Sequence, residues 1–344
     1  MATHMYVFNL VHHIAITDGI NTMTLSIEIV NILNALLTNR QCDEMRSGPL
    51  EPCADLYSLC EQRGLYNKEL HQPLVDRMEQ RDLPKFRLHP LFGHNKETGF
   101  KLEFFKLDQT CTSRLLLKVK ENRARPTSFF QTAALYALKR LYDENSLTFP
   151  GRILVEIAAS LRVRYVPNLS FSHCGFHTLM VIFPVDERRF GEFADFWRDV
   201  QYVHSLVEEY TSASTGALFS MSHSSGVEAF NRMFADAVGD EDRLNTVCHA
   251  LNKEVACDLA VSNLGSYVND HVSVFSESPV SIREMYCTDP LNSNPCISPG
   301  LVMHMVYWRG EIFVEIGANR SVFGASYLHR YKDIYLKFVL STLN

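Results

Sequence analysis

The amino-acid sequence predicts a mixed α/β protein in which helices pack on sheets. Three observations favour this class. Apolar residues recur at helical spacing in several long segments, short β-branched and aromatic runs lie between them, and the two kinds of segment alternate along most of the chain. The composition is that of a folded protein, because 46% of the 344 residues are hydrophobic and 21% are charged. A chain of this length is sufficient for two lobes around a cleft.

The first elements follow from local patterns. Residues 5–16 are rich in β-forming side chains and predict a strand, which Asp18 and Gly19 separate from a predicted helix over 20–39. The stretch 40–95 is rich in charge, proline and glycine, and it predicts loops with one short helix.

The rest of the chain alternates strands and helices. Residues 101–107 predict a strand, and Thr110 or Thr112 is expected to cap the next helix. Pro126 fits the first turn of another helix, where its missing N–H is not needed. The remaining predicted elements are strands over 152–165 and 176–185, helices over 188–212 and 224–237, strands over 256–267, 280–287 and 300–318, and a helix over 327–343.

Charge and cysteine usage narrow the class of protein. The net charge is −6, with 33 basic and 39 acidic residues and no basic stripe, so no nucleic acid is expected as a partner. The apolar runs are interrupted before the roughly 20 residues that a membrane span needs, and no signal peptide is evident. The nine cysteines include no CxxC pair, so we expect neither a zinc site nor a disulfide framework. Reduced thiols favour a cytoplasmic location.

Two histidines end the first apolar run. His12 and His13 precede the turn residues Asp18 and Gly19. An imidazole has an ordinary pKa of about 6.5, so it can accept and return a proton near neutral pH. The alternative interpretation is that both histidines are hydrogen-bonded residues at a strand end.

Further segments join this turn in a fixed order along the chain. They are a Leu-rich helix followed by an Ala-rich helix within 112–141, the segment 155–167, Gly175 before a strand, VSNLGSY at 261–267, and a hairpin that includes 307–316. In this order the set resembles the HxxxD acyltransferases of the chloramphenicol acetyltransferase-like superfamily, in particular the alcohol acetyltransferases and the condensation domains of nonribosomal peptide synthetases. The resemblance covers most of residues 8–340.

The resemblance implies two lobes, each a helix-backed mixed sheet, with a tunnel between them. It implies that His13 is the general base, that Asp18 braces the loop that holds this histidine, and that Gly19 allows the chain to turn into the helix. The residues that the resemblance places along the substrate tunnel are His12, Ser262, Asn263 and Gly265.

The implied reaction moves an acyl group from a thioester, such as acyl-CoA, to a small alcohol or amine. General-base help of this kind contributes about 10² to 10⁴ in rate. Because the thiolate is a good leaving group, the resemblance implies no resident cofactor and no metal, and coenzyme A enters only as part of the co-substrate.

Two features depart from the family pattern. Four residues, 14–17, separate His13 from Asp18, whereas the family has three. A one-residue shift in a strand turns a side chain to the opposite face unless a β-bulge absorbs it. In addition, few residues precede His12, so the resemblance implies an N-terminally truncated protein with an incomplete first lobe.

The expected organisation is therefore a remnant of the first lobe over 1–107, with the motif and a long crossing, and an acyltransferase-like lobe over 108–344. The exposed sheet edge of such a remnant is expected to promote self-association. The sequence leaves two functions open. One is acyl transfer; the other is a catalytically degenerate acyltransferase fold that binds an acyl thioester or a partner protein. A condensation domain that acts on carrier proteins is a third interpretation.

Overall fold

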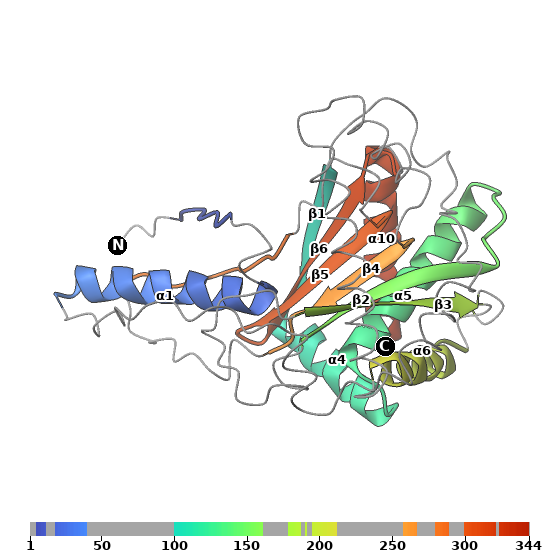
Figure 1. Ribbon diagram of the computed structural model, residues 1–344, viewed down its shortest axis with the longest axis horizontal. Helices are drawn as coiled ribbons and strands as arrows, with labels where there is room; N and C mark the ends of the chain where they lie inside the picture. The colour runs from blue at the N-terminus through green and yellow to red at the C-terminus, as the bar shows by residue number, and fades with distance from the viewer. Residues whose placement is uncertain are drawn as a thin grey trace, which may run out of the picture.

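The computed structural model describes residues 5–11, 18–39, 100–160, 178–186, 190, 195–211, 257–266, 279–288, 299–320 and 323–343. These residues form helices packed on a mixed sheet, which confirms the predicted α/β class (Figure 1). The helices are α1 (Gly19–Leu37), α4 (Gln109–Glu121), α5 (Pro126–Glu144), α6 (Phe196–Thr211) and α10 (Ala325–Thr342). The strands are β1 (Phe100–Leu107), β2 (Arg152–Ser160), β3 (Thr178–Asp186), β4 (Leu259–Asn263), β5 (Leu301–Trp308) and β6 (Glu311–Asn319).

The six strands form one sheet in the order β1-β6-β5-β4-β2-β3. Strand β4 runs parallel to β2 and β5, and the other neighbours are antiparallel. A two-residue turn joins β5 to β6, and its residues Arg309 and Gly310 both have positive φ, 51° and 85°. Positive φ at both positions is typical of the type I′ turn, whose twist matches that of a hairpin. The Gln109 side chain donates to the Arg309 carbonyl at 3.0 Å and holds the turn against the start of α4.

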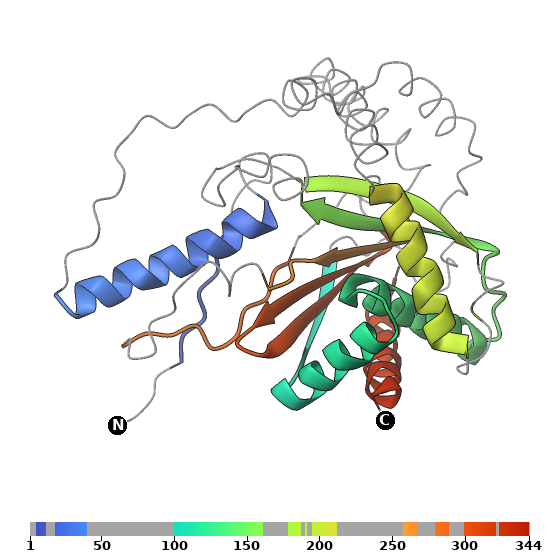
Figure 2. The same cartoon turned by 90° about the horizontal axis from the view of Figure 1, so that it is seen from below.

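Helices α4, α5, α6 and α10 cover one face of the sheet (Figure 2). Because side chains alternate along a strand, every second residue of β5, such as Met303, points into this helix-covered core. Helix α5 begins at Pro126, as predicted, and is buried along most of its length. The Tyr331 hydroxyl of α10 donates to the Ala134 carbonyl of α5 at 3.1 Å, so even the polar tip of this fully buried side chain is satisfied.

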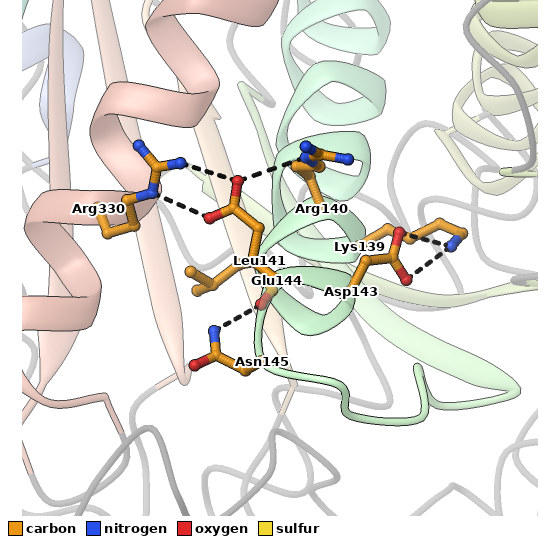
Figure 3. A network of polar contacts seen from close by, with 7 residues as sticks. All are labelled: Lys139, Arg140, Leu141, Asp143, Glu144, Asn145 and Arg330. Carbon is orange, nitrogen blue, oxygen red and sulfur yellow. Dashed lines mark hydrogen bonds and ion pairs between the residues drawn. The ribbon is translucent and has the colours of Figure 1, made fainter.

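Ion pairs connect α5 to α10 at the surface (Figure 3). Arg330 donates two hydrogen bonds to the Glu144 carboxylate, at 2.9 and 2.8 Å, and Arg140 adds a contact at 3.4 Å. The hydrogen bond from Arg330 is the main reason that the pKa of Glu144 is lowered. Lys139 and Asp143 form a separate pair one helical turn apart on α5, at 3.0 Å. The charged groups of these ion pairs therefore lie at the rim of the helix pair.

The first half of α1 packs on the opposite face of the sheet. Met23 and Ile27 join an apolar cluster with Val306, Trp308 and Phe313, at the hairpin end of β5 and β6. We call this face, which α4, α5, α6 and α10 do not cover, the open face. The start of α1 is thus fixed to the open face, and the helix then extends away from the sheet (Figures 1 and 2).

The second half of α1 is largely exposed, with Leu36 and Leu37 both 62% accessible. Asn34 fixes it to the segment around Val280, because its amide donates to the Val280 carbonyl at 2.9 Å and accepts from the Val280 N–H at 2.8 Å. Among the described helices, α1 is long and apolar enough to cross a membrane by length and composition, whereas no span was expected from the sequence. This is weak evidence for a span, because core helices and signal sequences have the same properties.

Three local predictions were wrong. Residues 5–11 form no strand, and Tyr6, Val7 and Val11 are 87 to 88% exposed. The segment 280–287 is also irregular. Several of its side chains, among them Ile282 and Met285, pack in the apolar cluster that includes Met23 and Ile27 of α1. Both segments have β-forming residues but pair with no described strand, and a strand needs a partner for its backbone groups.

The cap of α4 also differs from the prediction. Asp108, and neither Thr110 nor Thr112, is the N-cap, because its carboxylate accepts from the Cys111 N–H at 2.8 Å. This backbone hydrogen bond is the main cause of the lowered pKa of Asp108. The predicted helix over 224–237 and the stretch 40–95 lie outside the described residues.

Strand β1 bears on the expected domain boundary at residue 107. It precedes that boundary, yet it pairs antiparallel with β6 over its whole length, from Phe100 opposite Asn319 to Leu107 opposite Ile312. The division into 1–107 and 108–344 remains a prediction, and any division of the chain has to leave β1 with this sheet.

Candidate functional site

The predicted motif is described from Asp18 onward. Asp18 is buried and is the N-cap of α1. Its backbone is extended (φ −111°, ψ 178°), and the helix begins at the next residue, Gly19. Its carboxylate accepts from the Asn21 N–H at 3.0 Å, which satisfies one of the free donors of the first turn. Asp18 therefore fixes the direction in which the chain enters α1. His12 and His13 lie outside the described residues.

Gly19 brings the start of α1 against the segment that follows β4. A Cβ atom at this position would lie 2.5 Å from Cδ2 of Leu264, which is closer than two non-bonded carbon atoms approach. The missing side chain thus allows the Asp18–Gly19 turn to contact the Ser262–Gly265 segment directly. Two of the predicted site segments, far apart in the sequence, are neighbours in the fold.

Asn263 braces the Ser262–Gly265 segment. Its side chain donates to the Thr127 hydroxyl at the start of α5, at 3.1 Å, and accepts from the Gly265 N–H at 2.9 Å. Gly265 has a φ of 63°, a left-handed conformation that glycine adopts without strain. The Asn263 side chain thus points toward the helices, and it positions the segment from that side.

Ser262 belongs to the open face and lies opposite His304 of β5. His304 is in turn opposite Glu315 of β6, and its Nδ1 lies 2.7 Å from a carboxylate oxygen of that residue. Both are buried, with exposed fractions of 7% and 1%. A serine, a histidine and a glutamate from three adjacent strands therefore form one row across the open face.

The reasoning from sequence missed His304 and Glu315, although a signal was present. His304 precedes Arg309 by five residues, and Glu315 follows Gly310 by five residues. Residues at equal distances from a two-residue turn are cross-strand partners. Two polar residues at partnered positions in otherwise apolar strands indicate a paired polar site.

The surroundings of this pair are apolar. Val302 and Val306 flank His304 along the same face of β5, and Phe313 flanks Glu315 on β6; all three are buried. Gly317 leaves space for the pair, because a Cβ atom there would lie 2.9 Å from the second carboxylate oxygen of Glu315. Electrostatic interactions and hydrogen bonds are stronger in such a medium than in water.

Glu156 and Cys257 form another polar contact on the open face, with the thiol 3.7 Å from the carboxylate. Burial, and then the charge of Glu156, raise the pKa of the Cys257 thiol well above its ordinary value. The thiol therefore stays protonated and is a poor nucleophile. Within the part of the chain that the structure describes, no three His, Cys, Asp or Glu side chains are grouped as metal ligands.

Comparison with known proteins identifies the fold. No protein-family model and no curated protein matches the sequence. Solved structures do match, and 96% of this chain aligns with each of three of them. These are the first condensation domain of the CDA synthetase (TM-score 0.61, 13% identity, 63% of that chain), the EpoB NRPS cyclization-docking bidomain from Sorangium cellulosum (0.59, 15%, 58%) and the PapA2 acyl transferase (0.55, 14%, 64%).

The chain therefore has the chloramphenicol acetyltransferase-like fold, which confirms the resemblance at the level of the fold. It spans 58 to 67% of the length of the solved chains to which it is similar. Its described residues form one helix-backed sheet, and the second lobe that the resemblance implies remains a prediction.

Proposed function

We propose that the protein is an acyltransferase that moves an acyl group from a coenzyme A thioester to a small alcohol or amine. The observation that carries this proposal is the shared fold with the PapA2 acyl transferase and the condensation domains. The contact of Gly19 with Leu264 supports it, because this contact joins the Asp18–Gly19 turn to the Ser262–Gly265 segment, as a common site requires.

In the proposed mechanism His13 is the general base. Its imidazole removes the proton from the acceptor hydroxyl or amine as that group attacks the thioester carbonyl. The new C–O or C–N bond forms, the C–S bond breaks, and the proton passes to the departing thiolate. Asp18 holds the turn that positions the histidine.

The thiolate leaves without assistance from a metal, so the mechanism assigns no role to a resident cofactor. We propose a cytoplasmic location, where cysteines stay reduced. Cys111 and Cys257 are free thiols, in keeping with this.

One observation favours a second function. In a regular strand, the extra residue between His13 and Asp18 would turn the histidine to the face opposite to that of the family pattern. In that case the protein would bind an acyl thioester or a partner protein without turnover. The two functions differ in whether thioester binding leads to release of a free thiol.

The test measures thiol release with acetyl-CoA and octanoyl-CoA as donors and with primary alcohols and amines as acceptors. We expect release that depends on the acceptor, and a loss of about 10² to 10⁴ in rate for His13→Ala. His329→Ala, on the exposed surface of α10, is the matched control and should leave the rate unchanged. Thioester binding by calorimetry without release from any donor would favour the binding function instead.

Ile14 provides a sharper test of the motif. Deleting it restores the family spacing between His13 and Asp18, and Ile14→His places an imidazole at that spacing without shortening the chain. If the extra residue displaces the base, both variants should transfer acyl groups faster than the wild type. If a bulge already compensates, the wild type should be active, and the deletion should not accelerate it. Activity that survives His13→Ala unchanged would remove His13 from the mechanism.

A further inference from the structure

We propose that His304 and Glu315 form a second acid–base site, in which His304 contacts the acceptor and Glu315 positions the imidazole. This inference rests on the proposed acyltransferase function, and it names residues that the motif does not contain. The argument begins from where the pair lies on the sheet.

The pair lies on the face to which the motif is attached. Two positions along β5 from His304, Val306 contacts the cluster that includes Met23 and Ile27 of α1. On the other side of His304, Val302 belongs to a second buried cluster, with Leu154 of β2. The histidine and its carboxylate are therefore the polar centre between two apolar patches of the open face.

Ser262 connects the pair to the predicted tunnel segment. It is in register with His304 on the adjacent parallel strand, and both side chains point to the same face. Neighbouring strands are about 4.8 Å apart, so a group that contacts the His304 ring also lies beside Ser262. Leu264, which Gly19 contacts, is only two residues further along.

The hydrogen bond to Glu315 selects one form of the imidazole. A carboxylate that accepts from Nδ1–H fixes the neutral tautomer with its lone pair on Nε2, the form that accepts a proton from a substrate. The bond measures 2.7 Å, and Gly317 leaves the space that the carboxylate occupies. Within the described part of the chain, Nε2 of His304 has no hydrogen-bond partner.

Other histidines of the described residues lie in different settings. His204 contacts Glu208 at 3.4 Å, with that carboxylate 67% exposed, and His329 is itself 60% exposed on α10. Exposed pairs of this kind contribute little to stability. His304 and Glu315 are both buried, and replacement of a buried ion pair by apolar residues of similar volume is often neutral or stabilising, so stability alone does not account for the pair. A buried histidine paired with a buried carboxylate in such a place is a candidate functional site.

The proposed step conserves atoms and electrons. Where the extra residue of the motif turns His13 away from the acceptor, Nε2 of His304 takes the proton of the acceptor hydroxyl in its place, while the hydroxyl oxygen attacks the thioester carbonyl carbon. The C–O bond forms and the C–S bond breaks, and the imidazolium returns the proton to the departing thiolate. The products are an ester and free coenzyme A, and the histidine is neutral again.

The first test is His304→Asn in the full chain, with thiol release from acetyl-CoA and a primary alcohol as the readout. The asparagine amide replaces Nδ1 and keeps a donor for Glu315, but it removes Nε2. We expect kcat to fall by about 10² to 10⁴, with KM and the melting temperature little changed. Glu315→Gln should lower kcat less, because the ring keeps Nε2. The matched control, His329→Asn, should retain wild-type kcat.

A second variant separates chemistry from stability. His304→Phe combined with Glu315→Leu replaces the pair by apolar side chains and should fold at least as stably as the wild type. Loss of turnover in this folded variant supports the proposal, whereas retained turnover overturns it. Wild-type ¹⁵N NMR of the imidazoles provides a readout without mutation. Ethyl-CoA, a non-transferable thioether, together with the alcohol should shift Nε2 of His304, and an unchanged resonance would contradict the contact.

The outcomes distinguish this inference from the proposed function. A wild type that transfers acyl groups, together with a His304→Asn variant within about twofold of it, overturns the inference and leaves the acyltransferase intact. A wild type that releases no thiol from any donor overturns both. A wild type that transfers acyl groups, together with a loss of kcat in the His304 and Glu315 variants and none in His329→Asn, supports both.

Discussion

The two faces of the sheet carry polar groups in different ways. On the helix-covered face the sheet presents a continuous apolar surface, and the ion pairs of Glu144 and Arg330 lie at the rim of the helix layer (Figure 3). On the open face, His304 and Glu315 lie between two apolar clusters. The first arrangement keeps the core apolar and its charges at the surface, whereas the second buries a histidine and a glutamate, the pair for which we propose a second acid–base site.

A buried polar pair on the helix-covered side sharpens this contrast. Tyr136 of α5 donates to Asp199 of α6 at 2.7 Å, and aromatic rings surround the tyrosine. Burial raises the pKa of the Asp199 carboxyl and of the Tyr136 hydroxyl. The tyrosine therefore remains a donor at all moderate pH values. This hydrogen bond joins two helices, whereas the open-face pair joins two strands beside a predicted tunnel.

The largest expected effect is on the helix-covered face. Leu141 is fully buried in the core between α5 and its neighbours, so Leu141→Ala leaves a cavity and should lower the free energy of unfolding by about 2 to 5 kcal/mol. Leu117→Ala is the control, because Leu117 on α4 is 57% exposed, and it should change stability by less than about 0.5 kcal/mol. Denaturant unfolding measures both. Equal effects of the two variants would show that this core is not tightly packed.

An intermediate effect is expected on the open face at Gly317. A Cβ atom there would overlap the Phe100 ring and lie 2.9 Å from the Glu315 carboxylate, so Gly317→Ala should lower the free energy of unfolding by about 1 to 3 kcal/mol. Gly151→Ala is the matched control, because a Cβ atom there meets nothing within 4 Å. If displacement of Glu315 matters for chemistry, Gly317→Ala should also slow thiol release. Thermal unfolding that gives the same loss for both variants would contradict the crowding at residue 317.

The smallest effect is expected at the rim. Arg330→Ala removes the partially exposed pair with Glu144 and should lower the free energy of unfolding by less than about 1 kcal/mol. Because Arg330 lowers the pKa of Glu144, the contribution is present above the ordinary value of 4.5 and is lost as the pH falls through the folded-state pKa. Wild type and variant should therefore differ at pH 7 and converge near pH 3. Lys139→Ala, which removes the pair on α5 alone, should have an even smaller effect. A difference that persists at pH 3 would assign the effect of Arg330 to packing.

Much of the fold could be predicted from local patterns. Helical spacing of apolar residues identified α1 and α5, Pro126 identified the start of α5, and the apolar hairpin identified β5 and β6. The prediction failed where local preference was insufficient. Residues 5–11 have the composition of a strand, but a strand forms only where another strand satisfies its backbone groups. Asp108 displaced the two threonines as the cap of α4 because its carboxylate reaches the Cys111 N–H.

Local sequence determined the described helices and the position of the two-residue turn at Arg309 and Gly310, and this turn in turn fixes the pairing of His304 with Glu315, although the pair was not predicted. These features depend on neighbours within a few residues, so a linear pattern contains them. Only the tertiary structure decided that Ser262 lies beside His304 and that Gly19 contacts Leu264. Parallel strand pairing and helix docking join segments that are distant in the chain. Burial of apolar surface selects among the many ways to join them, and because the hydrophobic effect is non-directional, no local pattern specifies which segments meet.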